Sequence, residues 1–295
     1  MIAPCGWVAF ATGGMPPSWD GMVVLGLVTF AAAAINAIAG GGTILTFPCL
    51  TAILPDAPAR LVTANATSTL GLWPGALTAA WASRGKRDGV PAWTRVLLPV
   101  SVVGAVVGTA LVLLLPPRWF AGAVPWLILA AAVLFAIQPR LASLAGAAPV
   151  AADGGPPARR LAVAAVLQFL VAVYGGYFGA GIGILMLAVL GCLGLGDIHR
   201  LNALKNVLAT AVNGTTALVF VAAAALPAGA MPPRWEGTAG AELVSWPHVA
   251  VMAAAAAGGG FAGTRLADRL PAGIVRRCVA LIGFALAGYH WAKPW

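Results

Sequence analysis

The sequence predicts an all-α membrane protein that crosses the bilayer several times, built from two inverted repeats of about five helical segments each. Hydrophobic residues make up 61% of the 295 positions and charged residues only 8%, whereas a soluble domain carries roughly a quarter charged residues. Several apolar runs approach or exceed the ~20 residues that a membrane-spanning helix requires. The order of long and short apolar segments also occurs twice along the chain, which indicates an internal repeat.

Five apolar segments make up the first predicted repeat, residues 22–137. They are 22–39, 43–54, 61–82, 94–115 and 119–137. A hydrophilic linker rich in proline and glycine follows at 138–160, and we expect it in the cytoplasm. The second predicted repeat, 161–292, contains the segments 161–178, 182–195, 201–226, 247–264 and 274–292. The second segment of each repeat is short at 1.5 Å per residue, so about eight to ten spans are expected.

Matching residues at a constant displacement support the repeat. Over the first three segments the displacement is 140 residues, and from the fourth segment it is 155. The matched pairs include Gly41–Gly181, Ile44–Ile184, Arg60–Arg200, Leu61–Leu201, Gly104–Gly259 and Gly108–Gly263. The Gly104/Gly108 and Gly259/Gly263 spacing is typical of closely packed membrane helices.

The distribution of lysine and arginine favours inverted halves with both termini outside, because basic residues concentrate in loops on the cytoplasmic side. If all five segments of each half cross and the N-terminus lies outside, twelve of the seventeen basic residues fall inside and only four outside. The four are Arg60, Arg118, Arg234 and Lys293, and Lys205 lies within a segment. Joining each short segment to the one before it gives nine inside and seven outside, a weaker asymmetry.

Two glycine-rich stretches interrupt apolar runs at equivalent places, NAIAGGGTILTFP from Asn36 and YGGYFGAGIGILML from Tyr174. Non-helical backbone survives at membrane depth only where protein or water surrounds it, and breaks at equivalent points of two inverted halves indicate a central binding site. The N–H groups of half-helix N-termini favour an anion. The alternative is that these glycines only permit close helix packing. The candidate residues are Asn36, Gly40, Gly41, Gly42, Thr43, Gly179 and Gly181.

Polar side chains in the segments after the breaks form two stripes. One comprises Asn202, Asn206 and Asn213 and is flanked by Lys205, and the other comprises Asn65, Ser68 and Thr69; Asn65 aligns with Lys205 in the repeat. Such residues are costly in hydrocarbon and usually face an interior path, so we expect them to bind substrate. The alternatives are hydrogen bonding between helices for the asparagines and snorkelling of Lys205 to the interface.

The remaining residues exclude several classes of function. All eight acidic residues fall in loops or at segment ends, whereas cation transporters and proton pumps commonly carry carboxylates within their spans; a small anion is therefore favoured. The four cysteines and three histidines lack the spacing of a metal site, and no catalytic or nucleotide-binding motif stands out. We expect no enzymatic activity, cofactor or metal. The basic residues lie mainly in loops, where they orient membrane helices, and they do not cluster on a soluble face. Nucleic acid is therefore not an expected partner.

Several motifs resemble the TauE/SafE family, also called the sulfite exporter family, over roughly residues 22–290. They are NAIAGGGTILTFP with ANATSTLGLWPGALTAAW, the stretch from YGGYFGAGIGILML to NALKNVLATAVNGTTALVF, and GGGFAGTRLADRLP. The resemblance implies about eight spans and transport of small anions such as sulfite, sulfoacetate or other organosulfonates.

Together these observations predict a secondary transporter in the plasma membrane that works by alternating access. Its expected partners are a small anion and the lipid bilayer; a homodimer and the identity of a coupling ion are left open. A passive anion channel and a non-transporting membrane scaffold are the alternatives.

Overall fold

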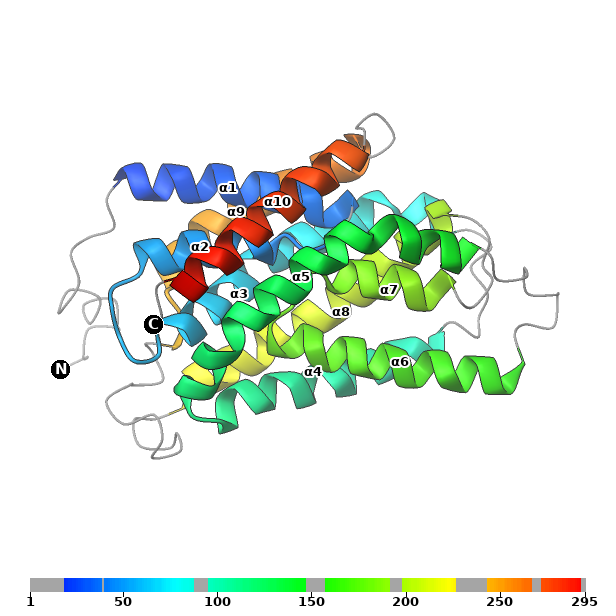
Figure 1. Ribbon diagram of the computed structural model, residues 1–295, viewed down its shortest axis with the longest axis horizontal. Coiled ribbons are helices and arrows are strands. Elements are labelled where there is room, and N and C mark those ends of the chain that lie inside the picture. Colours follow the sequence, from blue (N-terminus) through cyan, green and yellow to red (C-terminus); the bar gives the residue numbers. More distant parts are fainter. Residues whose placement is uncertain are drawn as a thin grey trace, which may run out of the picture.

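The computed structural model describes residues 19–38, 40–87, 95–146, 157–191, 198–226, 243–266 and 272–292. These residues form ten α-helices and no strand, and most of the helices run along the long axis of the molecule (Figure 1). The all-α prediction is confirmed.

The helices match the predicted segments closely. The first half contains α1 (Trp19–Ile38), α2 (Thr43–Ile53), α3 (Arg60–Ala82), a short 3-10 helix η2 (Arg84–Arg87), α4 (Leu97–Leu114) and α5 (Pro117–Gly146). The second half contains α6 (Ala158–Tyr177), α7 (Ile182–Gly191), α8 (Ile198–Ala224), α9 (Trp246–Leu266) and α10 (Ala272–Ala292).

Prolines set two of the helix ends. Leu54 and Leu115 follow the last residues of α2 and α4 and adopt extended backbone, with ψ of 143° and 148°. Each precedes a proline, which disfavours helical backbone in the residue before it. Pro117 then opens α5, where its missing N–H costs no helical hydrogen bond.

One boundary differs from the apolar pattern. Helix α5 continues to Gly146, nine residues past the predicted segment end at 137 and into the predicted linker. Leucine and alanine at 141, 142, 144 and 145 maintain helix propensity although Gln138 and Arg140 lower the hydropathy. A helix can therefore outlast the apolar run that predicts it. Part of the predicted linker, 147–156, lies outside the described residues.

Six described helices are long and apolar enough to cross a membrane. They lie at Trp19–Ile38, Leu97–Leu114, Pro117–Ile137, Ala158–Tyr177, Arg200–Ala224 and Trp246–Leu266; Thr43–Ile53, Ile182–Gly191 and Arg277–Gly288 are shorter apolar helices. Large hydrophobic side chains such as Val23, Leu27 and Leu281 are exposed on the outside of the bundle, where lipid replaces water as the solvent. The prediction of a multi-pass membrane protein is confirmed.

The two halves interlock by exchanging their fourth helices. Helix α4 of the first half packs on α6 and α8 of the second, and α9 of the second half packs on α1 and α3 of the first. The remaining large contacts join equivalent helices, α3 with α8 and α5 with α10. These contacts thus have counterparts in both halves, whereas α5 contacts α7 much more extensively than α10 contacts α2.

Glycines make the exchanged contacts close. A Cβ added at Gly104 or Gly108 would overlap the backbone of α6, and one added at Gly259 or Gly263 would overlap the backbone of α1. The small-residue packing predicted for these four positions is therefore confirmed.

The first helices of the two halves, α1 and α6, run in opposite directions. In Figure 1, α1 begins at the left-hand end of the bundle and α6 at the right-hand end, and α10 ends at the left. This is consistent with the inverted halves that the basic residues predict, and the inverted repeat itself stays a prediction.

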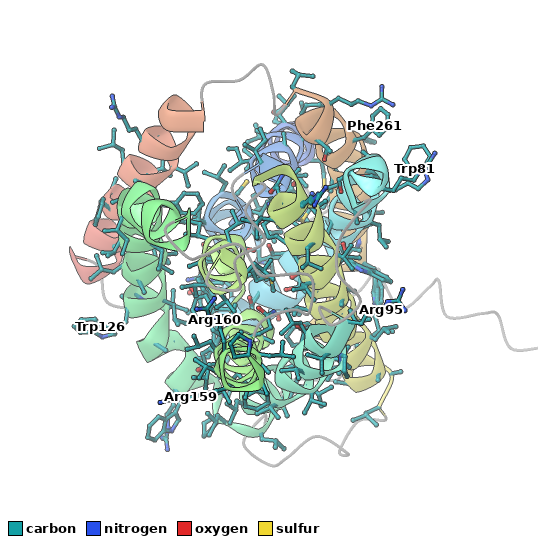
Figure 2. The ribbon with its side chains drawn as sticks, turned by 90° about the vertical axis from the view of Figure 1, so that its right-hand side faces the viewer. Trp81, Arg95, Trp126, Arg159, Arg160 and Phe261 are labelled. Atoms are coloured by element: carbon teal, nitrogen blue, oxygen red, sulfur yellow. The ribbon has the colours of Figure 1, made fainter. Side chains whose placement is uncertain are left out.

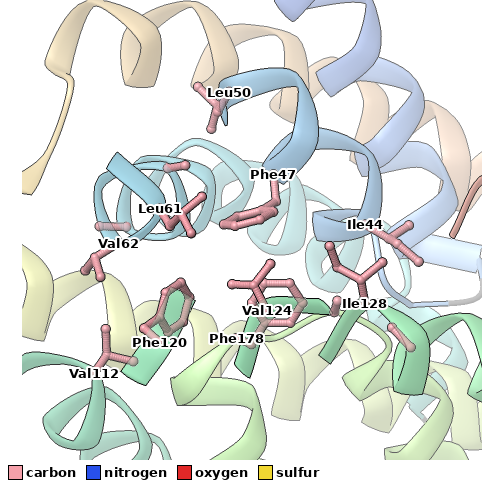
Figure 3. Packing of buried hydrophobic residues seen from close by; sticks show 14 of the residues in the cluster. Ile44, Phe47, Leu50, Leu61, Val62, Val112, Phe120, Val124, Ile128 and Phe178 are labelled. Carbon is pink, nitrogen blue, oxygen red and sulfur yellow. The ribbon is translucent and has the colours of Figure 1, made fainter. Parts of the chain in front are cut away.

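An aromatic cluster holds α2 and the break after α6 against α5. Phe47 on α2 packs edge-on against Phe178, with ring centroids 5.2 Å apart, and both contact Phe120 on α5 at 6.5 and 6.2 Å (Figure 3). All three are buried, and such aromatic pairs contribute about 0.5–1.5 kcal/mol beyond their burial. Since Phe178 follows α6 directly, this cluster fixes the positions of both helix breaks.

Exposed aromatic and basic side chains occupy one end of the bundle. Trp81 of α3 and Phe261 of α9 lie together at its edge, with ring centroids 6.0 Å apart (Figure 2). The guanidinium of Arg84 lies 4.3 Å over the Trp81 ring and that of Arg265 lies 4.7 Å over the Phe261 ring. A tryptophan with an amphipathic ring, beside aromatic rings paired with cations, suits the headgroup level of a bilayer.

Candidate functional site

The first glycine-rich stretch breaks the helix between α1 and α2. Gly40 and Gly41 have φ of 77° and 114°, in the left-handed region where glycine is favoured. The side chain of Asn36 folds over the break, since its Oδ1 accepts hydrogen bonds from the N–H of Gly41 at 2.8 Å and of Gly42 at 3.4 Å. The N–H groups that precede α2 are therefore satisfied from within the chain.

The second stretch breaks the helix between α6 and α7 in the same way. Gly179 and Gly181 have φ of 80° and 79°. The hydroxyl of Tyr174 donates to the Ala180 carbonyl at 2.6 Å. The position equivalent to Asn36 is Gly176, which has no side chain to cover this break. Both predicted breaks are present, but they are covered differently.

The two breaks pack directly against each other. A Cβ on Gly40 would overlap the backbone of Gly183, and one on Gly41 would lie 3.0 Å from the backbone nitrogen of Gly181 and 2.5 Å from the Phe135 ring. Gly41 and Gly181 are matched positions in the predicted repeat, so the two breaks meet at matched points of the two halves. Only glycine permits this approach.

Lys205 of α8 lies in the interior beside the first break. Its side chain is fully buried, and Nζ donates hydrogen bonds to the carbonyl oxygens of Ala37 at 3.1 Å and Asn36 at 3.4 Å, at the end of α1. Its Cδ lies 3.3 Å from where a Cβ on Gly183 would stand. The side chain therefore does not snorkel to the interface. Within the described residues no carboxylate pairs with it.

Asn65 of α3 occupies the mirrored place at the second break. Its Nδ2 donates to the carbonyl oxygen of Tyr177 at 3.0 Å, at the end of α6. Residues 37 and 177 are separated by the same 140 positions as 65 and 205, so the two hydrogen bonds are equivalent in the repeat. Asn65 is buried, and its Oδ1 has no partner among the described residues.

The other predicted site residues are placed less centrally. Ser68 shares a 2.7 Å hydrogen bond with Thr46 of α2, and Thr69 donates to the Asn65 carbonyl within α3. Thr43 opens α2, with its Oγ1 3.9 Å from where a Cβ on Gly179 would stand. In the described part of the chain, no hydrogen bond joins Asn202, Asn206 or Asn213 to either break, although Asn202 Oδ1 and Asn206 Nδ2 are buried without a partner there.

Sequence reasoning missed three residues at the breaks: Thr46, Tyr174 and Gly183. Thr46 lies one turn after Gly42, so helical periodicity from the break could have included it. Tyr174 and Gly183 both lie in the second glycine-rich stretch. Gly183 aligns with Thr43 in the repeat, and that match signals its position opposite the first break.

An apolar groove of about 430 Å³ lies between α4 and α6, away from the breaks. It is lined by Pro99, Val100, Val103, Ala165, Val166 and Phe169. It contains none of the predicted site residues, and its lining suits a lipid chain rather than an anion.

Comparison with known families gives a match over most of the chain. The family model described as Sulfite exporter TauE/SafE matches residues 25–290, which extend from α1 to α10. Comparisons with curated proteins and with solved structures gave no match.

Proposed function

Because the chain belongs to the sulfite exporter TauE/SafE family, a family of membrane transporters of sulfite-like anions, we propose that it is a secondary transporter that works by alternating access in the plasma membrane. The proposed substrates are sulfite, sulfoacetate or related organosulfur anions. We place the substrate site where the two helix breaks meet, and we propose that the halves are inverted with both termini outside.

One observation carries this proposal: two broken helices contact each other beside a fully buried lysine. An ammonium group removed from water is costly unless it is paired. The carbonyls of Asn36 and Ala37 solvate Lys205, but they do not neutralise its charge. An anion bound nearby would do so, and the N-terminus of α7 at the second break adds N–H donors of the right polarity.

The interlocked packing supports alternating access. If the halves are inverted, exchanging their two conformations converts a state open to one side into a state open to the other. The exchange of α4 and α9 between the halves couples any movement of one half to the other. The glycine contacts at the centre are packed backbone on backbone, which allows sliding without side-chain interlocking.

The test is flux in proteoliposomes with radiolabelled sulfite, sulfoacetate and sulfate. We expect saturable uptake that is stimulated by unlabelled substrate on the opposite side. We expect Lys205→Ala to reduce it at least tenfold, since the variant removes the buried charge. Arg159→Ala is the matched control, because Arg159 is exposed and its loss changes net charge equally.

Three results would contradict parts of the proposal. Flux without counterflow would indicate an anion channel. The absence of flux for every anion would indicate a scaffold. Unchanged flux in Lys205→Ala would remove Lys205 from the site.

A further inference from the structure

The two breaks differ in the hydrogen-bond partners that the chain supplies to them. At the first break the protein supplies partners for three groups: Asn36 Oδ1 accepts from the N–H groups of Gly41 and Gly42, and Lys205 donates to the carbonyl of Ala37. The carboxamide of Asn36 thus occupies the position that an anion would take at the N-terminus of α2. This half of the centre is filled.

The second break lacks the acceptor that Asn36 supplies at the first. Gly176 replaces Asn36, and the N–H groups of Ile182 and Gly183 in the first turn of α7 have no acceptor among the described residues. A helix leaves such first-turn donors unsatisfied unless a side chain or ligand accepts from them. An acceptor is therefore missing at this break.

A donor is missing there as well. Asn65 is 1% exposed, and its Oδ1 has no partner in the described part of the chain. Its orientation is set by the protein, because the Tyr177 carbonyl can only receive a donor and so faces Nδ2 rather than Oδ1. The acceptor oxygen of Asn65 is therefore left to accept from a group that carries a proton.

We propose that the second break binds an oxyanion that carries one proton, with its bare oxygens on the first-turn N–H groups of α7 and its O–H donated to Asn65 Oδ1. Hydrogen sulfite in its hydroxyl form has this arrangement of donors and acceptors. This inference rests on the proposed function and narrows its substrate class.

The same geometry discriminates against anions without a proton. Sulfate and sulfonate groups are fully deprotonated at neutral pH, so they would place an oxygen against Asn65 Oδ1 and leave that buried acceptor unpaired. An unpaired buried acceptor lowers affinity by about tenfold to a hundredfold. We therefore expect the protein to prefer sulfite to sulfate by roughly that factor.

The test is competition in proteoliposomes, with unlabelled sulfite or sulfate against labelled sulfite at mildly acidic and mildly alkaline pH. In the wild-type protein we expect sulfate to compete at least tenfold less well than sulfite. We also expect the apparent KM for total sulfite to rise with pH, because the hydrogen sulfite fraction falls as the anion loses its proton near neutrality.

Two substitutions of Asn65 test whether its side-chain oxygen acts as a hydrogen-bond acceptor for the substrate. Asn65→Leu removes the acceptor, and we expect the sulfite-to-sulfate ratio to approach one. Asn65→Lys introduces the donor that the equivalent position carries in Lys205, and we expect the preference to shift toward sulfate. Thr78→Ala on the same helix is the control, because Thr78 bonds the carbonyls of Gly75 and Ala257. It should keep the wild-type ratio.

The wild-type measurements test the inference even if the Asn65 variants do not fold. Equal competition by sulfate, or a KM that is independent of pH, overturns it while sulfite transport stands. An unchanged sulfite-to-sulfate ratio in folded Asn65→Leu protein also overturns it. If the wild-type protein neither binds nor transports sulfite, the proposed function fails and the inference fails with it.

Discussion

Lys205 Nζ lies 3.1 Å from the carbonyl oxygen of Ala37, and the lysine side chain that makes this hydrogen bond is fully buried. The bond joins α8 of the second half to the end of α1 in the first. A cation at a helix C-terminus is favoured by the helix dipole. Lys205 therefore both stabilises the first break and places its amine in the centre of the protein.

Charge alone should not suffice at position 205. We expect Lys205→Arg to recover only a small part of the flux that Lys205→Met loses, since a guanidinium is planar and wider than the ammonium. The lysine chain passes close to Gly183, which leaves little room for a wider group. Initial rates of sulfite uptake measure this, and full activity in Lys205→Arg would show that the close passage is unimportant.

The contact between the breaks should be sensitive to a single methyl group. We expect Gly183→Ala to lower stability by about 1–3 kcal/mol, because overpacking forces backbone shifts and the added Cβ would lie 2.6 Å from Gly40 Cα. The control is Gly122→Ala in α5, where a Cβ meets nothing within 4 Å. Thermal unfolding in detergent compares them, and equal midpoints would contradict the packing of the breaks.

Asn36 should act through its acceptor oxygen. In Asn36→Ala the N–H groups of Gly41 and Gly42 lose their partner, and we expect a loss of about 1–3 kcal/mol of stability. Asn36→Asp retains an acceptor and should recover most of this loss. The measurement is again thermal unfolding, and equally unstable Asp and Ala variants would assign the effect to something other than this hydrogen bond.

The hydrogen bond between Thr46 and Ser68 joins α2 to α3 at 2.7 Å inside the protein. A double-mutant cycle with Thr46→Val and Ser68→Ala should give a coupling of about 0.6 kcal/mol, and up to about 1.7, as for other bonds between membrane helices. Additive effects of the two substitutions would show that the bond makes no contribution.

The inverted arrangement is open to a labelling test. In a cysteine-free background, Arg84→Cys after α3 and Ala225→Cys after α8 occupy equivalent places in the two halves, and both positions are exposed. We expect membrane-impermeant reagents to label them from opposite sides of the membrane. Labelling of both from one side would exclude inverted repeats.

Much of the fold was predictable because a spanning helix requires a continuous apolar run, which can be recognised in a short stretch of sequence. A run of about 20 apolar residues has few alternatives to a spanning helix, and all ten predicted segments correspond to helices. The glycine breaks were predictable for a similar reason, since left-handed backbone favours glycine. The end of α5 was not, because hydropathy reports burial in lipid and a helix may continue beyond it.

The sequence by itself determined that the chain is a helical membrane protein and where its helices break, and it predicted that Asn65 and Lys205 hold equivalent positions. Only the tertiary structure decided that α4 and α9 are exchanged, that Lys205 turns inward to the end of α1, and that Asn36 fills one break while the other stays open. The exchange of helices and the placement of Lys205 depend on contacts between residues far apart in the chain, 168 positions for Lys205 and Ala37, and the bonds of Asn36 depend on how the backbone turns at the break. Local pattern gives the type and length of a helix, but its partners are selected by packing across the whole bundle.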